Sequence, residues 1–276
     1  MDWCINLVCL LMQSKSPLRP APAQQAQEPI ALVWLKRDLR TQGHLPLDLA
    51  ERGGPDYRIL FLLEPSVWRA PDLDRRHLRF IWESLRDIED RLRPFGRRVD
   101  VMFGEAEQVM RWWVRSVRLA AVYSYQESGT RLTFDRDRRV GKRLRSLGVA
   151  WTECEADGVR RGITDRSGWD AHWRRAMAEE AVVNRFSPAG DAARGAADHP
   201  FAMPDPETDP WPDSWPDAWR SADARVRGAD GDLLPFPDAR PDGMMPGGET
   251  AAGSRLERFL ESGGEGYRRS ISKPME

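Results

Sequence analysis

The stretch that decides the fold is Ile30-Ala-Leu-Val-Trp-Leu35, an unbroken run of apolar residues. Such a run is typical of a β-strand that is buried on both faces. Ile59-Leu-Phe-Leu-Leu63 has the same character. Three less purely apolar runs predict further strands at Val99–Phe103, Ala120–Ser124 and Val149–Glu153. The chain is therefore expected to contain five short strands.

Helical patterns fill the segments between these strands. The clearest is Arg75–Leu92, where apolar residues recur every three or four positions and charged residues occupy the rest. Two more helices are predicted at Ala106–Val117 and Val140–Leu147. Strands that alternate with helices predict a Rossmann-like α/β domain, a five-stranded parallel sheet with helices on both faces.

The loops after the strands are the expected place for functional residues. Ligands of parallel sheets bind beyond the carboxyl ends of the strands, near the point where the strand order reverses. We therefore expect functional side chains after Leu35, Leu63, Phe103 and Ser124.

Several well-known motifs are missing from the sequence. The turn Trp34–Arg40 lacks the glycine pattern that lets a backbone approach pyrophosphate. The sequence has no Gly-x4-Gly-Lys-Ser/Thr loop and no Gly-x-Ser-x-Gly elbow. A nicotinamide site, a P-loop nucleotidase and an esterase are thereby disfavoured.

The composition of the chain limits which ligands and which cellular compartment we expect. The chain has 276 residues, a formal net charge of −1, and only three cysteines and four histidines, none with metal-ligand spacing. We predict no metal site and expect a monomer in the cytoplasm. Residues 1–29 are interpreted as a disordered leader, because residues 14–27 are polar and rich in Pro, Ala and Gln. The apolar run Ile5–Met12 has no basic residue before it and is too short to span a bilayer. A targeting role for this leader is the alternative.

The sequence pattern changes after residue 165. Trp169–Val183 predicts one helix, whereas residues 187–248 are rich in Pro, Asp, Gly and Ala and predict little regular structure. We assign residues 30–165 to the α/β domain, residues 166–249 to an interdomain linker and residues 250–276 to the start of a second, all-α domain.

Three tryptophans spaced four apart, Trp211, Trp215 and Trp219, stand out in this linker. We interpret them as residues that pin the linker onto a domain surface. An aromatic ligand box is the alternative.

An ordered set of motifs resembles the photolyase/cryptochrome family. Val33-Trp-Leu-Lys-Arg-Asp-Leu-Arg40 with His44-Leu-Pro-Leu47 resembles the opening motif of that family. Arg75–Leu85 is similar to its helix after the second strand. Val122-Tyr-Ser-Tyr-Gln-Glu-Ser-Gly129, followed by Arg136-Asp137, resembles its fourth strand and the loop after it. Gly266-Tyr-Arg-Arg-Ser-Ile-Ser-Lys-Pro274 resembles the start of its FAD-binding helical domain.

The resemblance implies a cofactor at each end of the chain. An antenna chromophore, a folate or a deazaflavin, is expected near the α/β domain. Glu127 matches a family glutamate that contacts a pterin, with a surface glutamate as the alternative. Lys36 and Arg37 are expected to line the same antenna site, and Asp38 and Arg40 to form an internal ion pair. Tyr267 matches a family tyrosine that touches FAD, with packing on its own domain as the alternative.

The resemblance also implies a function, that of a light-dependent deoxyribodipyrimidine photolyase, a flavoprotein lyase that repairs pyrimidine dimers in DNA. A blue-light photoreceptor cryptochrome is the first alternative, and a stand-alone nucleotide-binding α/β module is the second. The flavin pocket, the lesion-binding cleft and any catalytic residue are expected beyond Glu276, so the fragment itself is expected to be inactive. No catalytic residue is assigned within it.

Two local features depart from or add to this pattern. Gly43-His44 stands where the family carries Asp-Asn. The basic run Arg131–Arg145 is interpreted as a solvated helix face, because Asp135 and Asp137 interrupt it. A phosphate-binding face is the alternative.

Overall fold

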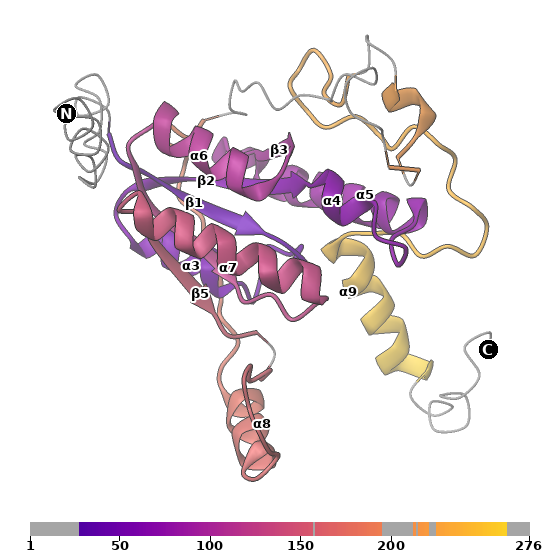
Figure 1. Cartoon of the computed structure of the whole chain (residues 1–276). Coiled ribbons are helices and arrows are strands. Elements are labelled where there is room, and N and C mark those ends of the chain that lie inside the picture. The colour runs from indigo at the N-terminus through magenta and orange to yellow at the C-terminus, as the bar shows by residue number, and fades with distance from the viewer. Residues whose placement is uncertain (1–27, 157, 195–211, 214, 221–224, 264–276) are drawn as a thin grey trace, which may run out of the picture.

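The structure, a computed structural model, describes residues 28–156, 158–194, 212–213, 215–220 and 225–263. Its centre is one five-stranded parallel sheet with the strand order β3-β2-β1-β4-β5 (Figure 1). The strands are β1 (Ile30–Leu35), β2 (Asp56–Leu63), β3 (Val99–Phe103), β4 (Leu119–Tyr125) and β5 (Ala150–Cys154). The predicted fold class is confirmed.

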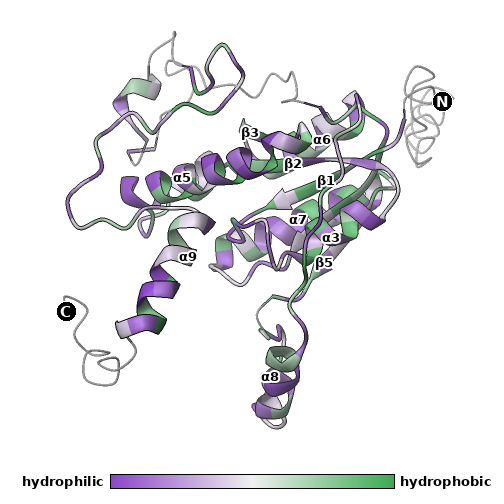
Figure 2. Ribbon diagram, turned by 180° about the vertical axis from the view of Figure 1, so that it is seen from behind, coloured by the Kyte–Doolittle hydropathy of each residue, from purple (hydrophilic) through white to green (hydrophobic). Residues whose placement is uncertain are grey.

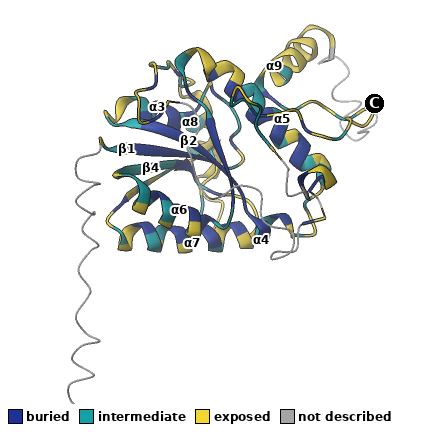
Figure 3. Ribbon diagram, turned by 90° about the horizontal axis from the view of Figure 1, so that it is seen from above, coloured by how far each residue is buried: buried dark blue, intermediate teal, exposed yellow. Residues whose placement is uncertain are grey.

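Helices cover both faces of the sheet. The helices between the strands are α3 (Leu45–Arg52), α4 (Pro65–Trp68), α5 (Arg75–Leu92), α6 (Ala106–Ser116) and α7 (Arg131–Ser146), with the 3-10 turn η1 (Arg93–Phe95) after α5. Alternate residues of β1 point to opposite faces. Val33 packs in a core with α3 and α5, while Trp34 packs in a second core with α6 and α7. Figure 3 shows the buried strands between these two helical layers.

The apolar stripe predicted for α5 is present. Leu78, Trp82, Leu85, Ile88 and Leu92 are each at most 1% exposed, and all of them pack in the first core. Figure 2 shows hydrophobic and hydrophilic residues alternating along this helix. At its start, Asp74 and His77 form a reciprocal capping box that satisfies free backbone N–H groups.

Several helices differ from the sequence-based expectation, among them α4, which the sequence did not predict. The α7 helix begins at Arg131 instead of Val140, because the Thr130 side chain caps its amino end by accepting from the Thr133 amide. The α3 helix was not predicted, and the His44 side chain caps it by accepting from the Leu47 amide.

The remaining described elements are short. They are α8 (Trp169–Ala178), η2 (Asp217–Arg220), α9 (Glu249–Arg258) and η3 (Phe259–Gly263). Neither α8 nor α9 buries a residue completely. Among the described helices, none combines the length and the apolar character that crossing a bilayer requires.

The described part of the linker packs on the α5 face of the sheet. Trp215 and Trp219 are 0% and 4% exposed, and both lie against the Phe103 ring, with centroids 5.4 and 5.9 Å away. Leu233 and Phe236 join the same core. Trp211 and the leader up to residue 27 lie outside the described residues.

Candidate functional site

The candidate site lies where the strand order reverses. The chain leaves β1 toward β2 and β3, then returns to place β4 on the other side of β1. The carboxyl ends of β1 and β4 therefore flank the switch point, where ligands of parallel sheets bind. Lys36 and Arg37 follow β1, and Glu127 follows β4.

A cavity of about 610 Å³ opens at this edge of the sheet. Its volume lies within the range of small-molecule sites, which is about 300–1,000 Å³. Much of its wall is apolar and comes from Leu35, Leu39, Phe61, Leu62, Val67, Trp68, Leu73, Phe80, Ile81 and Ala252. Four polar lining residues, Arg37, Glu64, Glu127 and Arg136, meet through ion pairs in one part of the wall, which we call the polar end. The lining also contains the polar residues Lys36, Arg40, Asp72, His77, Ser84, Thr133 and Glu249. An apolar slot with a polar end suits a planar conjugated ring that carries hydrogen-bonding groups.

The polar end is a cluster of ion pairs, which we call the ion cluster; it consists of Lys36, Arg37, Glu64, Glu127, Arg136 and Asp137. Arg136 is its centre. Its guanidinium lies 2.6 Å from Glu64 Oε1, 3.2 Å from Glu127 Oε2 and 2.9 Å from Asp137 Oδ1. Three cations face three carboxylates, so the cluster is balanced in formal charge.

Lys36 closes the buried side of the ion cluster. Its Nζ donates to Asp137 Oδ2 at 2.7 Å and to the Tyr125 carbonyl at 3.0 Å. The Trp34 ring lies below, with Lys36 Nζ 4.6 Å and Arg136 Cζ 4.9 Å from its centroid. Burial lowers the pKa of Lys36, although the Asp137 carboxylate opposes this shift.

Burial also acts on the pKa values of Glu64 and Arg136, which form the shortest ion pair of Arg136 in the cluster. Burial raises the pKa of Glu64, although Arg136 stabilises its charged form. Burial acts to lower the pKa of Arg136, but the carboxylates of Glu64 and Asp137 outweigh it and the pKa is raised. The Glu64–Arg136 pair is therefore held together by mutual charge in a region with little water.

The structure brings together three of the four residues expected to bind a cofactor. Glu127 and Arg37 form an ion pair of 3.1 Å, and Lys36 lies in the same ion cluster. Glu127 is only 4% exposed, so its interpretation as a surface glutamate is wrong. The Arg37 side chain is 63% exposed at the mouth. Tyr267 lies outside the described residues.

The expected ion pair between Asp38 and Arg40 is wrong. Asp38 Oδ2 lies 2.6 Å from His44 Nε2, and its Oδ1 accepts from the Lys36 amide at 2.9 Å. Arg40 donates instead to the Gly43 carbonyl. Because His44 Nδ1 accepts the Leu47 amide, its Nε2 carries the proton and donates to Asp38. His44, a departure from the family pattern, thus fixes the loop after β1.

Replacing Asp38 by asparagine is expected to lower the free energy of unfolding at pH 7 by about 1.5–3 kcal/mol, the range for a hydrogen bond to a charged group. Burial acts to raise the pKa of Asp38, but the hydrogen bonds from His44 and Lys36 outweigh it and hold the pKa below its ordinary value of 3.8. The unfolded chain therefore binds the proton first as pH falls.

This stabilisation is present above pH 3.8 and is lost as pH falls through the lower folded-state pKa. Urea unfolding of both proteins from pH 7 down to pH 3 measures it. The difference in the free energy of unfolding between the unmodified chain and Asp38→Asn should become smaller toward pH 3. A difference in the free energy of unfolding that stays constant with pH would show that Asp38 stabilises the loop by its shape alone. Asp135→Asn is the control, because Asp135 is partly exposed on α7.

Some site residues were not identified from the sequence. Glu64 directly follows β2, so the strand-end rule marked its loop but not the residue itself. Glu249, at the start of α9, accepts from the Thr41 amide and hydroxyl at 2.8 and 2.7 Å. Asp87 of α5 accepts from the Glu249 amide. These contacts hold α9 against the cavity, and Glu249 and Ala252 line it.

Comparisons with known proteins find matches for the α/β domain. Residues 31–161 match the profile of the family described as DNA photolyase. A (6-4)DNA photolyase of Oryza sativa subsp. japonica is 36% identical over 90 residues, which cover 29% of this chain and 16% of the relative. Cryptochrome DASH of Synechocystis sp. is 25% identical over 183 residues, 58% of this chain and 36% of the relative.

A solved structure supports the fold. A bacterial class III photolyase from Agrobacterium tumefaciens superposes with a TM-score of 0.61 at 17% identity, covering 92% of this chain and 48% of that one. The profile match and these relatives show that the α/β domain is similar to that of the photolyase/cryptochrome family. It spans about half the length of this solved structure, and the matched segments span less of the curated relatives.

Proposed function

We propose that these residues form the N-terminal part of a light-dependent deoxyribodipyrimidine photolyase, and that the α/β domain holds its antenna chromophore. The observation that carries this proposal is the cavity at the switch point, with an apolar slot and a polar end built from Glu127 and Arg37. The family also includes cryptochromes, so a blue-light receptor is the second candidate.

The polar end of the cavity supports a folate or a deazaflavin as the ligand. Glu127 Oε1 accepts from Arg37 Nε and from the Gly129 amide, while Oε2 accepts from Arg136. A carboxylate has about four acceptor positions, so Oε2 retains one for an N–H group of a heterocyclic ring. Arg37 supplies donors at the mouth. We propose Lys36 as a positioning residue, because its ammonium is engaged by Asp137.

The proposed antenna site predicts an affinity change for Glu127→Gln. Equilibrium titration of the purified chain with a folate and with a deazaflavin, followed by fluorescence, should show one of them binding. The variant should bind that ligand about 1.5–3 kcal/mol more weakly, the range for a hydrogen bond to a charged group. Binding of neither ligand to the parent chain would refute the antenna assignment.

The control variant is Glu153→Gln. Glu153 is also a carboxylate in an ion pair, with Arg161 at 3.1 Å, but it does not line the cavity. Circular dichroism should show that both variants keep the fold. Equal affinity of Glu127→Gln and Glu153→Gln would remove Glu127 from the proposed ligand set.

The proposed enzyme and its alternative differ in one measurement. A photolyase that contains this α/β domain and the proposed FAD-binding helical domain should remove pyrimidine dimers from DNA under blue light. Electron donation from the flavin is what the cofactor supplies there. Dimers that persist under illumination, in a protein that has bound FAD, would favour the cryptochrome.

A further inference from the structure

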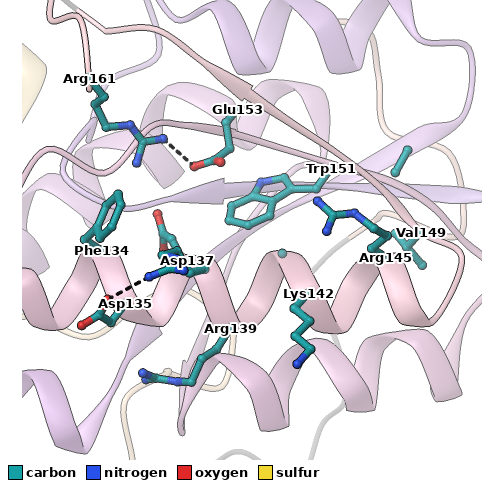
Figure 4. Close-up of a pocket in the computed structure, with 13 residues that line it drawn as sticks. Phe134, Asp135, Asp137, Arg139, Lys142, Arg145, Val149, Trp151, Glu153 and Arg161 are labelled. Carbon is teal, nitrogen blue, oxygen red and sulfur yellow. Dashed lines mark hydrogen bonds and ion pairs between the residues drawn. The ribbon is translucent and has the colours of Figure 1, made fainter. Parts of the chain in front are cut away.

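A second hollow, which we call the α7–β5 groove, runs along the outer edge of the sheet. It has a volume of about 1080 Å³ and lies between α7 and the edge strand β5 (Figure 4). Its lining residues are Phe134, Asp135, Asp137, Arg138, Arg139, Gly141, Lys142, Arg145, Val149, Ala150, Trp151, Glu153 and Arg161. The proposed antenna site does not explain this groove.

The floor of the α7–β5 groove is aromatic. The Trp151 indole N–H donates to Ser124 Oγ at 3.0 Å, so hydrogen bonding fixes the ring. Gly141 gives it room, because a Cβ there would lie 3.2 Å from Trp151 Cζ3. Phe134, 39% exposed, forms a second aromatic surface, with the Arg161 guanidinium 5.8 Å from its ring centroid. Trp151 is partly exposed, and Lys36 Nζ lies 5.1 Å from its ring centroid. Aromatic rings in such grooves are platforms on which bases can stack.

The acidic groups of the groove are already paired. Asp135 lies 2.7 Å from Arg131, and Glu153 lies 3.1 Å from Arg161. Asp137 is 4% exposed and pairs with Lys36 in the ion cluster. These carboxylates therefore present little uncompensated negative charge to a ligand.

The cations on the same wall are less engaged. The side chains of Lys142 and Arg145 have no hydrogen-bond or ion-pair partner within the described residues, and Arg138 lies 3.9 Å from Asp135. Spacings of four and three residues place all three on one face of α7. Figure 4 shows the Arg145 side chain beside Trp151.

We propose that the α7–β5 groove binds single-stranded nucleic acid, with phosphates on Arg138, Lys142 and Arg145 and a base on Trp151. A basic groove that carries aromatic platforms is the arrangement by which proteins hold single strands without reading their sequence. An acidic peptide would satisfy the cations but would leave Trp151 and Phe134 without a matching π-surface. The groove shares no lining residue with the antenna cavity, although Asp137 of the groove also belongs to the ion cluster. The proposal does not depend on the proposed chromophore.

The test uses a fluorescently labelled oligodeoxythymidylate of about 12 nucleotides, within the length that one binding surface covers. Fluorescence anisotropy with the 276-residue chain should show binding that weakens as salt rises. In Lys142→Glu/Arg145→Glu, the slope of log affinity against log salt should fall by about 1.4, since each phosphate contact in a single strand contributes about 0.7. An unchanged slope, or no binding by the parent chain, would overturn the proposal.

The control is Arg255→Glu/Arg258→Glu. This pair has the same spacing, lies in the last turn of α9 and changes the net charge equally. Its affinity and salt slope should match those of the parent chain. Equal loss in both variants would mean that net charge, and not the groove, attracts the oligonucleotide.

The aromatic floor is tested separately. An abasic oligonucleotide of the same length should bind at least about fivefold more weakly, because stacking a base on an aromatic ring contributes about 1–3 kcal/mol. Oligoglutamate should compete poorly. Equal binding of the abasic strand, or equally strong competition by oligoglutamate, would refute the nucleic-acid assignment in favour of a general anion surface.

Discussion

Replacing Arg136 by methionine is expected to lower the free energy of unfolding by about 3–5 kcal/mol, the cost of breaking a buried ion pair. Arg136 is 7% exposed and contacts Glu64, Glu127 and Asp137 at once. Methionine fills much of the same space but leaves these buried carboxylates short of a cation. Urea unfolding followed by circular dichroism measures the loss.

The pH dependence separates lost charge pairing from lost packing. Without Arg136, the pKa of Glu64 should rise further above its ordinary value of 4.5, because burial already raises it. A group whose folded-state pKa is raised favours the folded state when protonated and loses that advantage as pH rises through the folded-state pKa. The loss in the free energy of unfolding caused by Arg136→Met should therefore become smaller at acidic pH.

Arg138→Met is the matched control. Arg138 belongs to the same helix, but its side chain is 69% exposed and its nearest carboxylate is 3.9 Å away. Exposed pairs of this kind contribute about 0–1 kcal/mol. If the two variants lose similar stability, Arg136 contributes as little as a surface arginine and the ion cluster does not hold the cavity.

The strands could be predicted because their residues carry a purely local signal. Every residue of β1 is apolar and at most 2% exposed, so the sequence pattern and the burial coincide. Lys36, Arg37 and Glu127 were expected from the family resemblance, and the strand-end rule separately marked the loops after β1 and β4 in which they lie. The position of Tyr267 stays a prediction.

The ion cluster could not be predicted in the same way. Arg136 is one of several arginines in the basic run, and the run as a whole was interpreted as a solvated helix face. Its partner Glu64 lies 72 residues away, so only the folded chain identifies which arginine is buried. The solvated interpretation fits the side chains of Arg131 and Arg138, which are 81% and 69% exposed.

The loop after β1 shows a second limit. From the sequence, Arg40 was expected to be the ion-pair partner of Asp38. In the structure both ring nitrogens of His44 form hydrogen bonds within this loop. Nδ1 caps α3, and Nε2 donates to Asp38. A histidine with two simultaneous hydrogen bonds is recognisable only once the helix start is known.

Replacing Trp215 by alanine is expected to destabilise the chain by about 3–5 kcal/mol, the range for removing a large buried aromatic side chain. Trp215 is fully buried against Phe103 of β3, and its carbonyl accepts from Arg75 of α5 at 3.0 Å. We therefore infer that the linker around it folds as part of the α/β domain. The interpretation as a linker pinned by tryptophans agrees with this contact, since Trp219 also lies 4.8 Å from the Trp82 ring.

Trp169→Ala is the control for this prediction. Trp169 lies on α8 and is 38% exposed, so its removal should cost about 1 kcal/mol or less. Urea unfolding gives the two losses, and limited proteolysis shows where the chain opens. In Trp215→Ala, cleavage should shift into residues 225–249, because Leu233 and Phe236 lose the neighbour that completes their core. If cleavage appears there while the sheet unfolds at the same urea concentration as in the parent chain, the linker and the α/β domain are separate folding units.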